Sequence, residues 1–358
     1  MSSNNKPFAY SRRSFLRTTT LATGGVIIYG CANQGSQSLI KILHFPETVS
    51  RRSGALSANV SGRYAKNVEQ IRYRVNAGDW ITFSPDSPRV PSPFFTLEMR
   101  AEALKEGSNE LTIEATPNRG EPEITTLSFD YQPAPVVLPI TTDWSNIDSR
   151  QLDVQDGLWE TFATDDDGWR VRPKPGYEDY DRLLNVTGAF PGGRRVETTL
   201  TLRNQDDKNL YGFGLLTMWG GHPDEADVSP RRGWSFGISW YYSFYKGVGS
   251  EFSYKQGKEK PAWLSAYRNY DHKADTKYRL ISECFSETDA AGNHLRYRQQ
   301  MKWFVDGEAE PEDWVTLVDP SGEMVPEGEY SVAIVAHRSQ AEFGPVTVTP
   351  VEPVQVES

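Results

Sequence analysis

The sequence contains few cysteines, no excess of basic residues and no long internal apolar run. With 2 cysteines in 358 residues, neither a disulfide-rich scaffold nor a Cys-based zinc cluster can form. The formal net charge of -10 argues against binding to a nucleic-acid backbone, which requires a basic face. No internal stretch reaches the roughly 18 consecutive apolar residues of a transmembrane helix, so nothing beyond the N-terminus is expected to span a membrane.

The composition indicates a folded chain. Hydrophobic residues make up 37% of the sequence and aromatic residues 12%, which is enough apolar surface to build a core. At roughly 100–200 residues per domain, 358 residues suggest two domains.

Residues 1–30 combine positive charge with a short apolar segment, and they contain four basic residues and no acidic one. The run at 11–17, Ser-Arg-Arg-Ser-Phe-Leu-Arg, resembles the twin-arginine export signal, with Arg12 and Arg13 as the arginine pair. The apolar region at 18–29 is too short to span a membrane, as is typical of a signal peptide. Export is therefore expected, and a basic N-terminal arm is the alternative.

The signal region ends in a second recognisable motif. Residues 28–31, Ile-Tyr-Gly-Cys, resemble a lipobox, from which Tyr29 departs. The resemblance implies cleavage before Cys31, acylation of that cysteine and a short tether over 31–38, which would anchor the protein in a membrane facing the periplasm or the cell surface. If Cys31 were not lipidated, it would be free to form a disulfide with Cys284.

Residues 39–133 have the period-two pattern of antiparallel strands. Ile71, Tyr73 and Val75 alternate with polar residues, and turn signals separate about seven such segments. This pattern favours an immunoglobulin-like β-sandwich. The run from Ile71 to Trp80 also resembles the I-x-Y-R-V-N-x-G-x-W run of Ig-like modules in bacterial surface proteins, which implies a spacer role.

A proline-rich linker near residue 136 separates this region from residues 138–352, which hold nine of the ten tryptophans. Long alternating segments, such as those at 196–202 and 295–305, predict about twelve strands in a two-sheet jelly roll. The expected fold class is therefore all-β, an Ig-like β-sandwich followed by a jelly-roll sandwich.

The region 138–352 resembles a concanavalin A-like lectin/glucanase domain, also described as LamG-like. The resemblance is carried by short signatures: Asp-Gly-Leu-Trp at 156–159, Gly-Phe-Gly-Leu-Leu at 212–216, and Phe-Gly-Pro-Val-Thr-Val at 343–348. It implies a concanavalin A-like jelly roll and a glycan or polysaccharide partner. It does not imply one activity, because this fold hosts lectins, hydrolases and lyases.

Two enzyme classes, glucanases and polysaccharide lyases, each require particular catalytic residues. The glucanases of this fold carry E-x-D-x-E on one strand, and that spacing is absent; Glu287 and Asp289 come nearest but run into a predicted hairpin. A polysaccharide lyase needs a Tyr or His to move a proton and a cation to neutralise a uronate. The candidates for these roles lie in one hexapeptide and are Tyr267, Arg268, Tyr270 and His272. The alternative interpretation of this hexapeptide is a polar, aromatic loop without a catalytic role.

An aromatic stretch between residues 234 and 263 is the best candidate for ligand binding. Exposed aromatic rows stack on the C–H faces of sugar rings, and the alternative is a core strand covered on both faces. The ligand-binding candidates are Trp234, Trp240, Tyr242, Tyr245 and Trp263.

Metal sites have little support in the sequence. The histidines show no zinc spacing. Asp165 and Asp167 provide carboxylates that could serve calcium, without the spacing of an EF-hand. No cofactor is identified, and calcium remains open.

Together these features predict an exported, lipid-anchored envelope protein with a non-catalytic, carbohydrate-binding jelly-roll domain. The alternatives are a polysaccharide-degrading enzyme, for which a lyase is favoured over a hydrolase, and a structural or protein-interaction role.

Overall fold

The protein is described by a computed structural model. The model describes residues 38–84, 92–148, 151–165, 167–177, 181–203, 211–222, 230–231, 237–243, 247–254, 262–268 and 272–357; within 239–268 it describes, apart from Ser265, the backbone alone. Over these residues the regular structure is almost entirely β, with one 3-10 turn, η1 (Ala101–Ala103). None of the described segments forms a helix with the length and apolarity that a membrane span requires.

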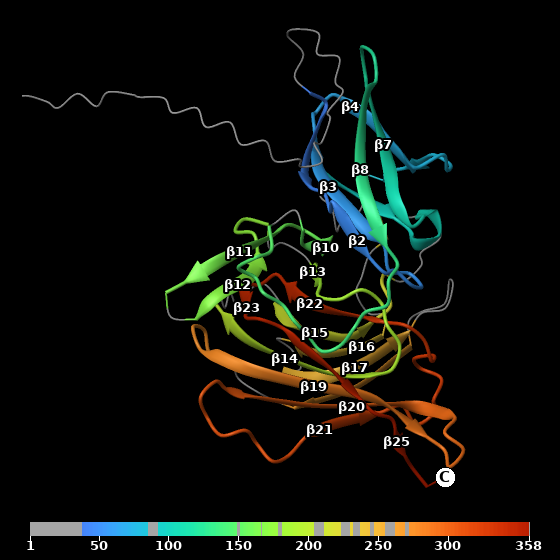
Figure 1. The fold of residues 1–358 in the computed structure, drawn as a ribbon. Helices are drawn as coiled ribbons and strands as arrows, with labels where there is room; N and C mark the ends of the chain where they lie inside the picture. Colours follow the sequence, from blue (N-terminus) through green and yellow to red (C-terminus); the bar gives the residue numbers. More distant parts are fainter. Residues whose placement is uncertain are drawn as a thin grey trace, which may run out of the picture.

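The N-terminal part is a sandwich of two sheets (Figure 1). The first sheet has the order β1 (Ile40–His44), β3 (Ala58–Tyr64) and β6 (Phe94–Met99). The second has the order β2 (Thr48–Ser50), β8 (Glu123–Gln132), β7 (Gly107–Pro117), β4 (Val68–Val75) and β5 (Ile81–Thr82), with β2 parallel to β8. This is the strand arrangement of an immunoglobulin-like sandwich, as the sequence predicted.

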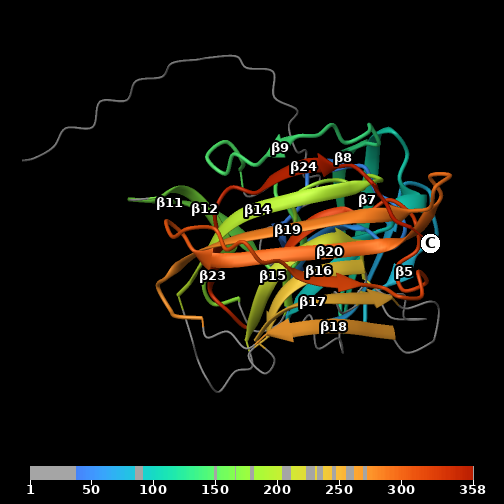
Figure 2. The same cartoon turned by 90° about the horizontal axis from the view of Figure 1, so that it is seen from below.

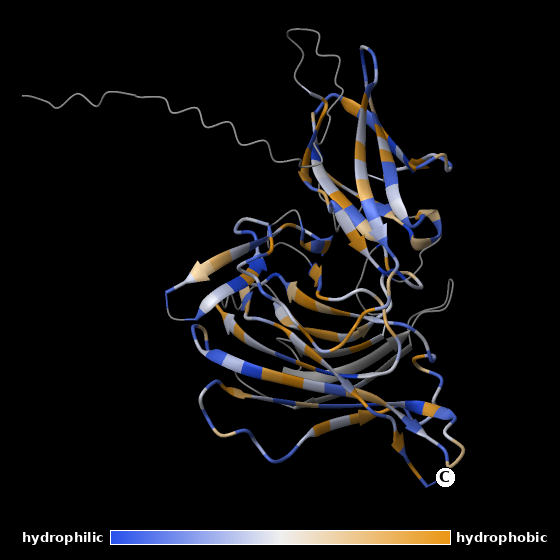
Figure 3. Cartoon of the chain, viewed as in Figure 1, coloured by the Kyte–Doolittle hydropathy of each residue, from blue (hydrophilic) through white to orange (hydrophobic). Residues whose placement is uncertain are grey.

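Alternating side chains build the core of this sandwich. Ile71, Tyr73 and Val75 are buried, and they share one cluster with apolar residues of β3, β6 and β7. Figure 3 shows the corresponding alternation of hydrophobic and hydrophilic residues along the strands. Trp80 lies at the edge, with the guanidinium groups of Arg72 and Arg74 4.6 and 4.8 Å from its ring centroid, so it packs as expected for a structural residue.

The C-terminal part is a larger sandwich of a seven-stranded and a ten-stranded sheet. The seven-stranded sheet has the order β10 (Asp153–Asp156), β13 (Asp181–Asn185), β22 (Ser331–His337), β15 (Gly212–Trp219), β16 (Gly237–Ser243), β17 (Gly247–Tyr254) and β18 (Ala262–Arg268). The main path of the ten-stranded sheet is β11 (Trp159–Thr164), β12 (Gly168–Pro173), β23 (Ala341–Phe343), β14 (Gly193–Leu202), β19 (Lys277–Thr288), β20 (His294–Val305) and β21 (Val315–Val318). Three short strands complete it: β9 (Ile140–Thr141), β24 (Thr347–Val351) and β25 (Val354–Gln355).

Figure 2 shows β14, β19 and β20 side by side in the ten-stranded sheet, consistent with their antiparallel pairing. The main core fills the space between the two sheets and includes Phe213, Leu215 and Ile334. Such face-to-face packing of antiparallel sheets is the jelly-roll arrangement that the sequence predicted.

The seven-stranded sheet has two distinct faces. Phe213 and Leu215 of β15 belong to the main core, whereas Leu216 and Trp219 belong to a second cluster on the opposite face. Leu56 of the N-terminal sandwich is part of this second cluster. Over β13, β22 and β15, the face of the seven-stranded sheet that points away from the main core is therefore the one that contacts the N-terminal sandwich.

Backbone as well as side chains join the two sandwiches. Ala55 forms a parallel β-bridge with Gly221, and a Cβ on Gly221 would lie 2.2 Å from the carbonyl carbon of Ala55. The side-chain amide of Asn59 donates to the carbonyl of Gln155 at 2.5 Å. The proline linker is thus one of several connections, and the N-terminal sandwich packs directly on the jelly roll.

Candidate functional site

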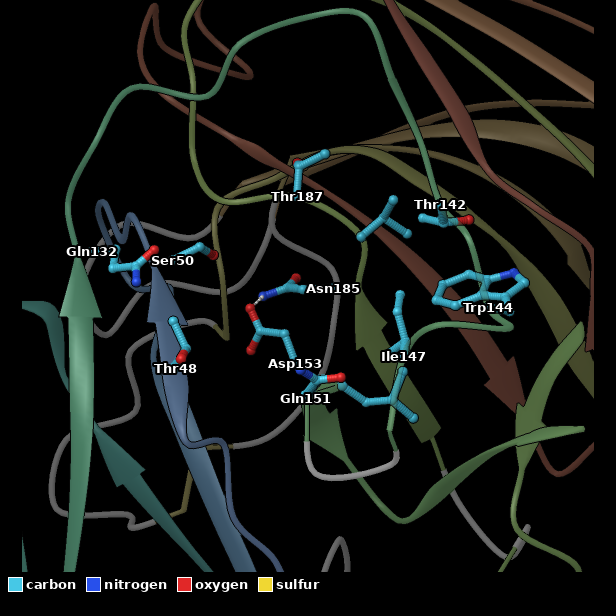
Figure 4. A pocket seen from close by; sticks show the side chains of 12 residues that line it. Thr48, Ser50, Gln132, Thr142, Trp144, Ile147, Gln151, Asp153, Asn185 and Thr187 are labelled. Atoms are coloured by element: carbon cyan, nitrogen blue, oxygen red, sulfur yellow. Dashed lines mark hydrogen bonds between the residues drawn. The ribbon is translucent and has the colours of Figure 1, made fainter. Parts of the chain in front are cut away.

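A pocket of about 250 Å³ lies at the junction of the two sandwiches (Figure 4). Thr48, Ser50 and Gln132, from strands β2 and β8, line its N-terminal side. The opposite side is formed by the segment 142–153 and by residues 185–187 of the jelly roll. Neither sandwich alone encloses the pocket, and junctions of this kind are frequent positions for ligand sites.

Asp153 occupies the centre of the pocket, at the first residue of β10. Its carboxylate accepts hydrogen bonds from Arg52 (Nη2 to Oδ2, 2.6 Å), Asn185 (Nδ2 to Oδ2, 3.1 Å) and Gln155 (Nε2 to Oδ1, 2.9 Å). An ionised carboxylate offers about four acceptor positions, so Asp153 keeps capacity for a further donor. These neighbours hold the carboxylate in one orientation.

The interior and the mouth of the pocket differ in exposure. Trp144 and Thr187 are buried in its walls, and the indole Nε1 of Trp144 donates to the carbonyl of Gly344 at 2.8 Å. Thr48, Gln132 and Gln151 are exposed and surround the opening. A ligand would therefore meet hydroxyl and amide groups at the mouth and an aromatic side chain further in.

The pocket carries no uncompensated charge in its described lining. Of the described lining residues, only Asp153 is ionisable, and its partner Arg52 has a fully buried side chain. Because the ion pair is internal to the protein, the pocket presents neutral hydrogen-bonding groups to a ligand.

The strand register places the aromatic residues predicted for ligand binding on different faces of the seven-stranded sheet. Trp240 and Tyr242 of β16 pair with Leu215 and Phe213 of β15, and paired positions share a sheet face, which here is the face of the main core. Trp263 of β18 pairs with Ser253 in β17, which in turn pairs with Gly237 in β16. Since Gly237 pairs with Trp219, the position of Trp263 is on the face turned away from the main core. Trp234 and Tyr245 lie outside the described residues.

The predicted lyase hexapeptide does not converge on one face. Tyr267 and Arg268 are successive residues of β18, so their positions alternate between the two faces of the sheet. Tyr270 lies outside the described residues.

His272 is 1% exposed and packs against the rings of Phe213 and Tyr278, with centroid distances of 4.9 and 4.2 Å. Burial lowers the pKa of His272 to about 3, so the imidazole is neutral and enclosed by the core.

The carboxylates nearest to glucanase spacing have structural partners. Glu287 is 1% exposed, and Arg296 and Arg298 each donate to it at 2.5 Å. Burial opposes ionisation, but these hydrogen bonds outweigh it and hold the pKa of Glu287 below its usual value. Asp289 accepts from the backbone N–H groups of Ala291 and Asn293 and thereby orders the turn between β19 and β20.

The calcium candidates do not form an oxygen cage. Asp165 is exposed, whereas Asp167 pairs with Arg170 through one oxygen and with Lys277 through the other, the latter at 2.6 Å. Two cations already neutralise Asp167, so these residues do not fit a calcium ion. Within the described part of the chain, no group of three or more His, Cys, Asp or Glu residues is placed to hold a metal.

Cys284 is a free thiol in β19 with no exposed surface. Arg12, Arg13 and Cys31, the residues of the predicted export and lipidation motifs, lie outside the described residues.

No protein-family model matches the sequence, and no curated protein matches it. Among solved structures, the carbohydrate binding module CBM66 from Bacillus subtilis is similar at 15% identity over 53% of this chain and 94% of that chain, with a TM-score of 0.30. The exoplasmic/lumenal domain of VIP36 in its Ca2+-bound form has 16% identity over 58% and 88% of the two chains, with a TM-score of 0.33. A Bacillus subtilis protein of unknown function with a galectin-like fold has 10% identity over 55% and 90%, with a TM-score of 0.33. At these scores, the function has to be argued from the residues of the chain itself.

The junction pocket has no counterpart in the sequence motifs. Its lining residues come from four separated stretches, between residues 48 and 187. The one local signal is the concentration of Trp144, Gln151 and Asp153 directly after the proline linker. That signal marks a segment, and only the packing of the two sandwiches turns it into a pocket.

Proposed function

We propose that this protein is an exported, lipid-anchored envelope protein whose jelly-roll domain binds a glycan without cleaving it. The all-β sandwich provides broad sheet faces on which a glycan can lie. The twin-arginine and lipobox resemblances at Arg12, Arg13 and Cys31 support export and anchoring of the chain.

The observation that carries the binding proposal is the distribution of positions on β16, β17 and β18. Tyr241 and Tyr267 both pair with Gly249, so the two tyrosine positions flank a glycine in one row of the face turned away from the main core. The next row of the same face holds Ser239, Glu251 and Ser265, and Ser265 is exposed.

A row of aromatic positions next to a row of polar positions suits a sugar, whose C–H faces stack on aromatic rings while its hydroxyls form hydrogen bonds. The burial of His272 supports binding over lyase chemistry, because proton abstraction requires a base within reach of the substrate.

The test is a glycan array with the chain carrying Cys31→Ser, together with assays for new reducing ends and for unsaturated products. We expect binding without turnover. Tyr267→Ala and Trp263→Ala should each lower the affinity for the bound glycan more than tenfold without unfolding the protein. Trp169→Ala is the matched control, because Trp169 is 41% exposed on β12, in the other sheet.

Turnover of a polysaccharide would replace the proposal by a lyase or hydrolase function. Absence of both binding and turnover would contradict it and favour the structural or protein-interaction alternative.

A further inference from the structure

We infer that the junction pocket is a binding site for one neutral sugar residue, the end of a glycan chain; this inference rests on the proposed function. The pocket has a volume of about 250 Å³. It is smaller than the roughly 300–1,000 Å³ of sites for drug-sized ligands. That size suits one sugar ring at the end of a chain.

The lining has the hydrogen-bonding character of a polyol site. The hydroxyl of Thr48 can donate and accept, as sugar hydroxyls do. The hydroxyl of Ser50 already accepts from Arg52 at 3.1 Å, and that of Thr187 from the backbone N–H of Val332 at 3.0 Å, so each of these two keeps its proton to donate. The amide of Gln151 accepts from the backbone N–H of Asp148 at 2.9 Å through its oxygen, and this bond orients its NH2 group. Asp153 contributes a fixed acceptor at the centre of the pocket.

Apolar walls complete the site. Trp144 and Ile147 line the jelly-roll side, as Figure 4 shows, whereas Thr48 and Gln132 line the opposite side. A pyranose ring has polar edges and apolar C–H faces, so a pocket with an apolar inner wall and a polar rim matches both.

Charge selects against acidic sugars. The carboxylate of Asp153 is compensated by Arg52, whose side chain is fully buried. A uronate or another anionic sugar would bring a second carboxylate near Asp153 and would find no free cation in the described lining. Burial of an unpaired charge is costly, so neutral sugars are favoured.

The pocket also assigns a role to the N-terminal sandwich. Thr48 and Ser50 belong to β2, and Arg52, which follows, holds Asp153 in place. The Ig-like sandwich therefore contributes ligand-facing side chains and positions the central carboxylate. It acts as part of the binding unit in addition to separating the jelly roll from the membrane.

The experiment titrates the chain carrying Cys31→Ser with the methyl glycosides of glucose, galactose and mannose, and with methyl glucuronide as the charged counterpart. Saturation-transfer NMR and calorimetry detect binding. We expect at least one neutral glycoside to bind and the glucuronide to bind at least tenfold more weakly.

Two variants address the pocket from its mouth, where the fold tolerates change. Thr48→Trp fills the opening, and Gln151→Ala removes an amide; both positions are exposed. Thr48→Trp should lower the affinity for the neutral glycoside at least tenfold, and Gln151→Ala should lower it at least fivefold. Thr126→Trp on β8 and Gln70→Ala on β4 are the matched controls at exposed strand positions away from the pocket, and they should leave the affinity unchanged.

Unchanged affinity in Thr48→Trp overturns the inference. If Tyr267→Ala removes binding in that case, the glycan function stands and its site is the face of β16–β18. Failure of every neutral glycoside to bind also overturns the pocket inference, and the glycan array then decides the proposed function separately.

Discussion

The guanidinium of Arg52 lies 2.6 Å from the carboxylate of Asp153, and this ion pair links the N-terminal sandwich to the first strand of the seven-stranded sheet. The Arg52 side chain is fully buried and that of Asp153 is 20% exposed. Nη1 of Arg52 also donates to the carbonyl of Ser50 at 3.0 Å. The pair therefore stabilises the junction and fixes the centre of the pocket at the same time.

Arg52→Ala should destabilise the protein because it leaves Asp153 without its cation at the domain junction. We expect a loss of about 3 kcal/mol in the free energy of unfolding, typical of removing one partner of a buried pair. Denaturant unfolding of the chain carrying Cys31→Ser measures it. Arg51→Ala is the control, because the Arg51–Glu329 pair is about 30% exposed on both sides and should cost under about 1 kcal/mol. Equal losses in both variants would contradict this role of Arg52.

His272 should make stability depend on pH. Burial lowers its folded-state pKa from 6.5 to about 3, so the fold favours the neutral imidazole. The contribution of the neutral His272 to the free energy of unfolding is fully present above pH 6.5. It is lost as the pH falls toward 3, and the whole loss is about 5 kcal/mol at most. His272→Phe should flatten the decline in the free energy of unfolding over that interval relative to the unsubstituted chain. Identical pH profiles for both proteins would show that His272 is accessible when protonated.

Trp240→Ala distinguishes the core from the ligand face. Because Trp240 pairs with the core residue Leu215, we expect this change to cost about 3–5 kcal/mol of stability. Under conditions where the variant is folded, its glycan affinity should stay within about threefold of the original. A stable Trp240→Ala protein that no longer binds glycan would return the site to the face first suggested by the aromatic pattern.

Cys284 should be unreactive in the folded protein. It has no exposed surface, and burial raises the pKa of its thiol to about 12, so the reactive thiolate is scarce at neutral pH. In the chain carrying Cys31→Ser, a thiol reagent should label no cysteine under native conditions and one after unfolding. Rapid native labelling would indicate that β19 opens readily.

Substitutions in the two N-terminal motifs test export and lipid anchoring separately. Replacement of Arg12 and Arg13 together by Lys should block export by the twin-arginine route and leave the precursor in the cytoplasm, as fractionation would show. Cys31→Ser should prevent incorporation of labelled palmitate and release the exported protein from the membrane. Membrane retention of the Cys31→Ser protein would contradict the lipid anchor.

The strands were predictable wherever one face of a sheet is buried and the other is not. Ile71, Tyr73 and Val75 alternate with polar residues, and the structure confirms them as core residues of β4. The sequence alone does not assign a single face in β16, where Trp240, Tyr241 and Tyr242 are aromatic at consecutive positions. Periodicity cannot assign such a run to a face, and only its pairing with β15 does so.

The sequence by itself predicted the all-β class and the alternating strands of two sandwiches, because alternation and turn residues are local. The export signal in the first residues stays a prediction. The tertiary structure decided which face each strand turns to the core. It also enclosed His272 between Phe213 and Tyr278, and it brought Thr48, Trp144 and Asp153 to one pocket. These arrangements depend on contacts between segments far apart in the chain, which no local pattern of residues encodes.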